Sequence, residues 1–345
     1  MIDDYGYINA RIRAMKSELL TADFYDELLS ADELSTLFEL LKGTPYAEDI
    51  TKARTKESRA LDVLVTAFRI NMERNFRKIL KFSAGEPNAL FRTILARYDI
   101  YNVKTILRGK IQGVEESEIR ASLLPAGVLD EVRLTELLKQ DTASGVLDLL
   151  ATWGIVFPFV IGRTLVKAVR EGSIQLMETY LEEAYFNWAF EEIAKGNGNK
   201  ELLKAILTSL VDMRNIMACL ILLRDHIKPL GRIKFLEGGR LSKTLIRALE
   251  NAEALEEGIE IVRKTEYGKP LRDREIKDLP TLERILEKAG IDRALSFKKE
   301  DPLGIGLGIY YIWAKETEVT NLRTIAFGIA FGVSKHEIRD SLVIP

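Results

Sequence analysis

The sequence predicts an all-α fold built from three degenerate copies of one helical unit. Apolar residues recur at helical spacing over most of the chain, and period-two alternation never lasts for more than a few residues. A short pattern, an acidic residue followed three positions later by Asn and an apolar residue, occurs three times. The three Asn residues are 113 and 106 positions apart, which indicates a repeat of roughly 110 residues.

We call this pattern the acid–Asn signature. Its three copies are Asp99 and Asn102, Asp212 and Asn215, and Glu318 and Asn321. Residues i and i+3 lie on one side of a helix, and a buried carboxylate or amide without hydrogen bonds costs about 1–3 kcal/mol. Two interpretations are open. Each pair braces its own domain by binding the backbone of a loop, or the three pairs line a shared axis and contact a partner protein.

Two further markers share this register. A break containing Thr44, Thr152 or Thr265 follows an apolar helix roughly 60 residues before each signature Asn. In addition, the segment 118–123 is echoed at 337–342, 219 residues later, which is two repeat lengths. The predicted domains are therefore residues 1–115, 116–230 and 231–345.

The first copy is predicted to contain helices over 5–42, 52–82 and 89–110. The first of them has apolar residues at steps of three and four with basic residues between them. The second has the clearest one-sided apolar stripe, from Leu61 to Ile79. Gly and Pro separate the three helices, because both residues interrupt helical runs.

The second and third copies are predicted to follow the same order. In the second copy, the expected helices are 134–150, one that carries Tyr180 to Ala189, and 200–226. In the third copy, they are 245–263, a shorter one over 282–289, and one from 301 to about 332. Asp301 is a suitable N-cap for the last helix, and Pro302 suits its first position.

Composition indicates a soluble globular chain. The 345 residues are 47% apolar and carry a net charge of −2, whereas nucleic-acid-binding domains usually show a basic face. The N-terminal residues lack the apolar core of a secretory leader. The apolar runs that stand out are shorter than the roughly 18–20 residues of a membrane span. We therefore expect no nucleic-acid partner and no transmembrane segment, and the single cysteine, Cys219, fits a reducing compartment.

No catalytic, cofactor or metal site is expected. The chain has two histidines and one cysteine, whereas a zinc site needs three or four such ligands. The segment 238–244 resembles a phosphate loop, but Ser242 stands where the Gly before Lys is required, so it is predicted to be a helix entry. The segment 304–308 fails the dinucleotide fingerprint. Gly304 and Gly308 are instead expected on one helix face, where a neighbouring backbone can approach closely.

Particular residues also point to a family. The chain resembles the C subunit of the archaeal and bacterial A/V-type ATPases and ATP synthases, which is similar to the d subunit of eukaryotic vacuolar ATPases. The strongest pieces are Tyr5–Arg13 and Asp301–Leu307, and Phe235–Arg240 and Pro345 are further matching positions. The resemblance covers nearly the whole chain.

The resemblance implies a funnel of three similar helical domains around a pseudo-three-fold axis. It implies a non-catalytic subunit, without cofactor, on the cytoplasmic face of the membrane. The expected partners are the central stalk, built from subunits of the D and F type, and the proteolipid rotor ring. Two other hypotheses stay open: a helical adaptor that does not co-purify with ATPase subunits, and an enzyme that uses a cleft of carboxylates with perturbed pKa values.

Overall fold

The structure is a computed structural model that describes residues 5–153, 162–195, 199–227, 235–272, 276, 278–296 and 304–343. Within these ranges the backbone forms 17 α-helices and one 3-10 helix, with no β-strand. The prediction of an all-α chain is confirmed.

The helices belong to two compact units. The first comprises Met1–Leu181 and Leu303–Pro345, and the second comprises Glu182–Pro302, so that the division falls within α11 (Ile174–Ala194). The predicted domain boundaries after residues 115 and 230 follow the sequence repeat, and they stay a prediction.

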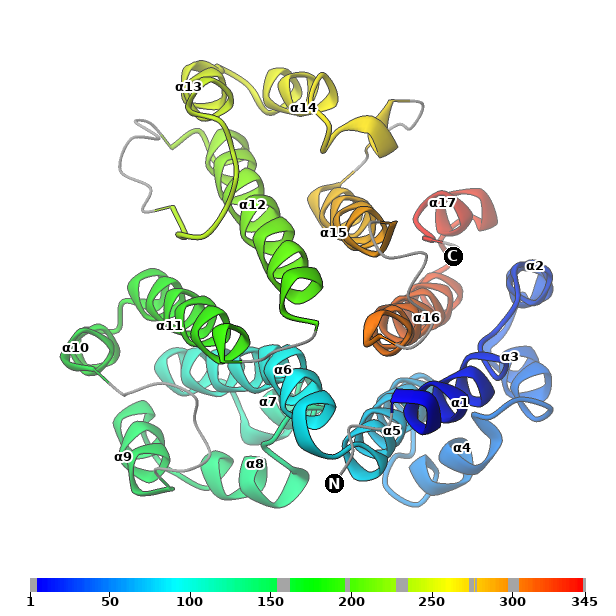
Figure 1. The fold of residues 1–345 in the computed structure, drawn as a ribbon. Helices are drawn as coiled ribbons and strands as arrows, with labels where there is room; N and C mark the ends of the chain where they lie inside the picture. The colour runs from blue at the N-terminus through cyan, green and yellow to red at the C-terminus, as the bar shows by residue number, and fades with distance from the viewer. Residues whose placement is uncertain are drawn as a thin grey trace. The chain divides into compact units, whose positions relative to one another are not determined.

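The first unit joins both ends of the chain in one core. Its helices are α1 (Tyr5–Lys16), α2 (Ala22–Ser30), α3 (Leu34–Leu41), α4 (Ala47–Ala53), α5 (Ala60–Phe82), α6 (Gly85–Gln112), α7 (Glu116–Ala121), α8 (Glu131–Leu138), α9 (Ala143–Trp153), α10 (Arg163–Arg170), α16 (Gly306–Ala330) and α17 (Lys335–Asp340). Helix α16 packs on α5 and α1, and α17 packs on α2 (Figure 1). The apolar stripe predicted on α5 supplies this core, because Leu64, Phe68 and Phe76 are fully buried.

The N-terminal region is more finely divided than predicted. The expected helix over 5–42 is three helices, since Thr21 caps α2 by accepting a hydrogen bond from the N–H of Phe24 (3.3 Å). The expected helix over 52–82 begins only at Ala60, as α5, because α4 ends at Ala53 and the polar residues 54–59 separate the two helices. Helix α16 begins at Gly306, and the predicted cap at Asp301 lies outside the described residues.

The second unit is organised around one long apolar helix. Its elements are α12 (Lys200–Arg224), α13 (Lys243–Asn251), α14 (Leu255–Arg263), η2 (Lys269–Leu271) and α15 (Leu279–Ser296), which is longer than predicted. Helix α12 packs against α15 and α14. It is long and apolar enough to cross a membrane by length and composition alone, but 72% of that stretch is buried within the fold. The core helix of a globular unit has the same composition, so α12 is accounted for by the packing around it.

The three signature helices, α6, α12 and α16, end in the same way. Each is followed by a residue in the left-handed conformation: Gly113 (φ 69°), His226 (φ 54°) and Gly332 (φ 68°). These residues are 113 and 106 positions apart, the spacing of the signature Asn residues. The next N–H in each copy returns to a carbonyl five residues earlier, at 2.8–2.9 Å, which is the Schellman closure of a helix end. The backbone thus repeats in the register of the sequence.

The echo of 118–123 at 337–342 has a packing explanation. In the first copy, a Cβ added to Gly109 would lie 2.4 Å from Ile119. In the third copy, a Cβ added to Gly328 would lie 2.5 Å from Ile338. Both pairs place a short helix directly on the glycine of a signature helix, and both isoleucines are buried.

Candidate functional site

Each signature Asn binds the backbone of one loop residue in both directions. The side-chain amide donates to the carbonyl oxygen and accepts from the N–H of the same residue. The pairs are Asn102 with Leu124 (2.8 and 2.7 Å), Asn215 with Leu236 (3.0 and 2.8 Å) and Asn321 with Val343 (2.9 and 3.1 Å). The loop residue is 21 or 22 positions after the Asn in all three copies. The amide therefore satisfies two backbone groups that a buried loop has to pair.

The acidic partner in the first copy holds a second part of the same loop. Asp99 is fully buried and accepts the N–H groups of Val128 (2.9 Å) and Leu129 (2.8 Å). Burial raises the pKa of the Asp99 carboxyl to about 7, although these two N–H groups favour the charged form. Gly127 directly precedes these two residues, and an added Cβ there would lie 2.3 Å from the Asp99 Oδ1 atom.

We expect Asp99 to make stability depend on pH. Its folded-state pKa is about 7, above the value near 3.9 of an unfolded chain. The folded state therefore binds more protons in this window, and its stability falls as the pH rises from about 4 to about 7. Relative to Asp99→Asn, the wild type should lose on the order of 2 kcal/mol of unfolding free energy between pH 5 and pH 8. Urea unfolding of both proteins tests this, and parallel pH profiles would contradict it.

The second copy has the same arrangement with one further donor. Asp212 accepts the N–H groups of Arg240 (2.6 Å) and Leu241 (3.1 Å), and it also accepts the hydroxyl of Tyr267. Burial raises the pKa of the Asp212 carboxyl as well, against the opposing effect of the Tyr267 hydrogen bond. An added Cβ at Gly239 would lie 2.4 Å from the Asp212 Oδ1 atom, as at Gly127 in the first copy.

The segment 238–244 is a carboxylate-binding turn that leads into a helix. Gly239 admits the Asp212 carboxylate, and Ser242 then caps α13 by accepting the N–H of Leu245 (3.1 Å). The predicted helix entry is present, and its glycine faces a carboxylate of the protein itself.

Gly239→Ala should lower the free energy of unfolding by about 1–3 kcal/mol, because the new methyl group overlaps the buried carboxylate. Gly43→Ala is the matched control, since nothing lies within 4 Å of its added Cβ. Urea unfolding monitored by circular dichroism measures both. Equal stability of the two variants would show that position 239 tolerates a methyl group beside the Asp212 carboxylate.

The third copy is assembled from both ends of the chain. Glu318 accepts the N–H of Leu20 (2.6 Å), the hydroxyl of Tyr46 (2.7 Å) and the Nζ of Lys315 (2.6 Å). Lys315 is buried, and burial lowers the pKa of its ammonium group against the opposing attraction of Glu318. Two of these three partners, Leu20 and Tyr46, come from the connections that precede α2 and α4, whereas Asp99 and Asp212 bind a loop 28 to 30 residues further on.

Tyr46 and Tyr267 are site residues that the sequence interpretation missed. Thr44 and Thr265 form matching turns, each donating to a carbonyl three residues earlier and accepting the N–H two residues later. Each turn points the following tyrosine hydroxyl at a signature carboxylate. The sequence signal that could have identified these tyrosines is the Thr-x-Tyr spacing that the first and third copies share. Thr152 is instead within α9 and is followed by Trp153, and no such bond to Asp99 occurs among the described residues.

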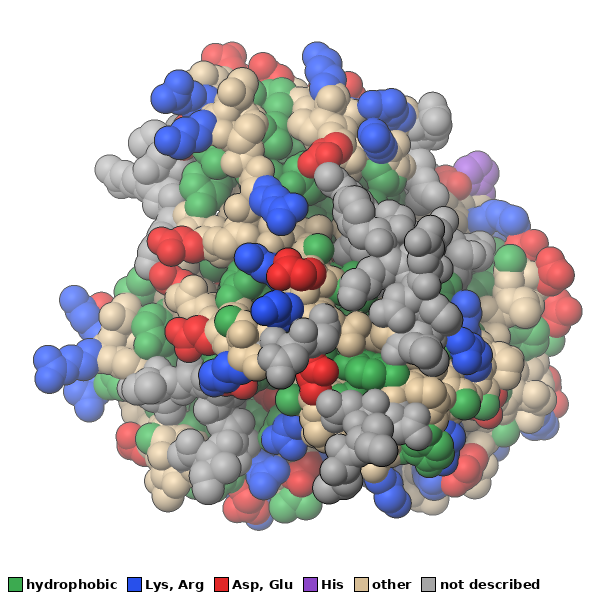
Figure 2. All heavy atoms as spheres, in the orientation of Figure 1, with side chains coloured by type: hydrophobic (Ala, Val, Ile, Leu, Met, Phe, Trp, Pro, Cys, Tyr) green, Lys and Arg blue, Asp and Glu red, His purple; other side chains and the backbone are tan. Residues whose placement is uncertain are grey.

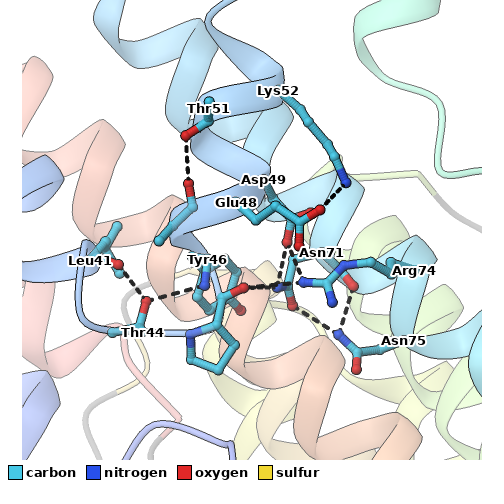
Figure 3. A network of polar contacts seen from close by, with 12 residues as sticks. Leu41, Thr44, Tyr46, Glu48, Asp49, Thr51, Lys52, Asn71, Arg74 and Asn75 are labelled. Atoms are coloured by element: carbon cyan, nitrogen blue, oxygen red, sulfur yellow. Dashed lines mark hydrogen bonds and ion pairs between the residues drawn. The ribbon is translucent and has the colours of Figure 1, made fainter.

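A polar network joins the turn at Thr44 and Tyr46 to α4 and α5 (Figure 3). Asp49 is fully buried, and its Oδ2 accepts from Asn71 (2.8 Å) and Arg74 (2.6 Å). Both donors also reach the carbonyl of Pro45, next to Tyr46. These bonds fix α4 on α5 and hold the Thr44 turn in place.

The two segments that carry the strongest resemblance meet in the first unit. Asn9 donates to the carbonyl of Gly304 (3.0 Å). An added Cβ at Gly308 would lie 2.4 Å from Phe91 and 3.0 Å from Ile12. Gly308 does allow close packing, but the groups that approach it are side chains and not a neighbouring backbone. Gly304 precedes the helix, so the expectation that both glycines lie on one helix face was wrong.

The arrangement as a whole fixes loops and exposes no reactive group. No cluster of three metal-ligating side chains occurs in the described residues. Five of the six signature residues are at most 1% exposed, and Asn215 is 6% exposed. On the face drawn in Figure 2, basic and acidic side chains are interspersed, with hydrophobic groups in small areas between them.

Comparison with known proteins gives the family. The family model described as ATP synthase (C/AC39) subunit matches residues 8–341. This chain belongs to that family. It is similar to the A-type ATP synthase C subunit of Methanococcoides burtonii, with 31% identity over 99% of this chain and 94% of that protein. It is also similar to the same A-type subunit from Halorubrum lacusprofundi (29%, covering 98% and 97%) and from Methanosarcina barkeri (27%, covering 99% and 93%).

Membership of the C/AC39 family confirms the resemblance read from the sequence and the assignment as a non-catalytic subunit of an A/V-type ATP synthase. It also makes the chain a peripheral component of a membrane-associated complex. Ion transport and ATP synthesis are activities of that complex.

Proposed function

We propose that this member of the C/AC39 family is the socket that couples the central shaft of the rotary ATPase to its membrane proteolipid ring. Shaft subunits of the D and F type would enter the socket, which would rest on the ring at the cytoplasmic face of the membrane. Family membership over residues 8–341 is the observation that carries this proposal. Proton or sodium transport then follows from the coupled rotation.

Local rigidity supports this role. A coupling piece must transmit torque without local unfolding, and local opening is easiest where backbone hydrogen bonds are exposed. Here the loops after α6, α12 and α16 are held by buried side chains of the signature helices. We propose that all six signature residues act as such braces. Their burial supports this over the alternative that they contact a partner along a shared axis, because a buried side chain presents no atom to a partner.

Affinity purification from detergent-solubilised host membranes tests the socket. The tagged chain should recover the ring proteolipid together with the central-stalk subunits, identified by mass spectrometry. Recovery of unrelated soluble proteins without ring or stalk would overturn the proposal and favour a helical adaptor. The purified chain alone should show no ATP turnover.

A further inference from the structure

A basic groove of about 520 Å³ lies along α5 in the first unit and is also lined by Lys52 of α4 and by Glu131, the first residue of α8. Its cationic lining residues are Lys52, Lys56, Arg74, Arg77, Lys78 and Lys81, against two carboxylates, Glu73 and Glu131. The whole chain carries a net charge of −2, so the positive charge of this groove differs strongly from the average charge of the chain. We propose that the groove docks an acidic helical segment of a partner protein.

Part of the positive charge in the groove is not neutralised by the chain itself. Lys52 pairs with Glu48, Lys56 with Glu131, Arg74 with Asp49 and Arg77 with Glu73. Among the residues that the structure describes, no carboxylate is within ion-pair distance of Lys78 or Lys81. These two lysines are the positions at which a partner's carboxylates add an ion pair without displacing an existing one.

The groove is preorganised along α5. Its lining positions on this helix, from Ile70 to Lys81, follow each other at steps of one and three residues and form one stripe. Eleven helical steps span about 16 Å. The opposite face of α5 is buried in the core, so the stripe cannot rotate away. Arg74 is fixed by its bonds to buried Asp49 and to the Pro45 carbonyl, as Figure 3 shows beside Lys52.

This geometry favours an acidic helix over other anions. The cations are spread over about three helical turns, which matches carboxylates at i, i+4 and i+7 of a facing helix. A single phosphate group needs donors that converge on one point. A membrane surface favours a basic face with exposed aromatic or large aliphatic residues, whereas Ile70 is the only large apolar residue among those lining the groove. Ile70 and the methylene stems of Lys and Arg give the groove an apolar floor.

The test uses the full-length chain and a fluorescein-labelled peptide of about 16 residues, long enough for the three turns of the groove. The peptide carries Glu at i, i+4, i+7 and i+11 on an Ala background, and a second peptide has Gln in place of Glu. Binding is followed by fluorescence anisotropy at low and at about 0.3 M salt, where screening is strong. The test variant is Lys78→Glu with Lys81→Glu. The matched control is Lys243→Glu with Arg247→Glu, the same charge change at exposed positions of α13.

The Glu peptide should bind the wild type, more weakly at high salt, and the Gln peptide should not bind. The Lys78/Lys81 variant should weaken binding of the Glu peptide about tenfold or more, whereas the control variant should change it less than about threefold. Equal weakening by both variants would show an effect of net charge and overturn the proposal. Binding to vesicles of anionic lipid through Lys78 and Lys81, without binding of the peptide, would overturn it in favour of a membrane surface. Unchanged circular dichroism spectra verify that both variants are folded.

Discussion

Glu318→Ala should lower the free energy of unfolding by about 3–5 kcal/mol. The variant leaves the ammonium group of Lys315 buried without its carboxylate. It also removes the acceptor of the Tyr46 hydroxyl and of the Leu20 N–H. An unpaired buried charge is among the most destabilising features that one substitution can create. Urea unfolding followed by circular dichroism measures the loss.

Two controls separate the buried charge from a general effect of losing a carboxylate. Glu39 forms an exposed ion pair with Lys42, so Glu39→Ala should change stability by less than about 1 kcal/mol. The double variant Lys315→Met with Glu318→Leu removes both charges and should recover much of the loss. If Glu318→Ala were as stable as Glu39→Ala, the third signature would have no bracing role.

Asn102→Ala should lower the free energy of unfolding by about 1–3 kcal/mol, because it leaves the N–H of Leu124 without a partner and the carbonyl of Leu124 with only the N–H of Ala126. Each unsatisfied buried group costs about 1–3 kcal/mol. The loss should be local to the loop after α6. Amide hydrogen exchange measured by mass spectrometry should therefore show faster exchange over residues 122–129, where Leu124, Val128 and Leu129 are held.

Asn88→Ala is the matched control for Asn102→Ala. Asn88 also donates to backbone carbonyls, those of Leu80 and Ser83, but it lies at the opposite end of α6. Its removal should leave exchange over residues 122–129 unchanged. Equal protection of that loop in the wild type and in Asn102→Ala would contradict the bracing role of the signature Asn.

The fold class and the repeat register could be predicted from the sequence because both depend on local pattern. The helical spacing of apolar residues can be recognised without knowing which elements they pack against, as the buried stripe of α5 shows. The left-handed residues after α6, α12 and α16 have the same spacing along the chain as Asn102, Asn215 and Asn321. An Asn three residues after an acid was a useful signal because buried polar groups have to be paired.

The partners of the signatures could not be predicted, because they come from distant segments. Nothing local to Glu318 indicates Leu20 or Tyr46, which are about 300 and 270 residues away in the chain. No local pattern singles out Gly127 or Gly239 as the partner of an acid, and only the folded structure places a carboxylate against each of them. The helix boundaries failed for a different, local reason: the Thr21 side chain caps α2, and the polar residues 54–59 separate α4 from α5, whereas the prediction followed only the apolar spacing.

Reconstituted transport tests the coupling role most directly. The A-type complex is assembled in lipid vesicles with and without this chain, and ATP hydrolysis and ion uptake are measured together. The account predicts that the complex without the chain hydrolyses ATP but takes up no ions, and that adding the purified chain restores uptake. Ion uptake at the same rate in the absence of the chain would show that torque reaches the ring by another route and would contradict the proposed socket.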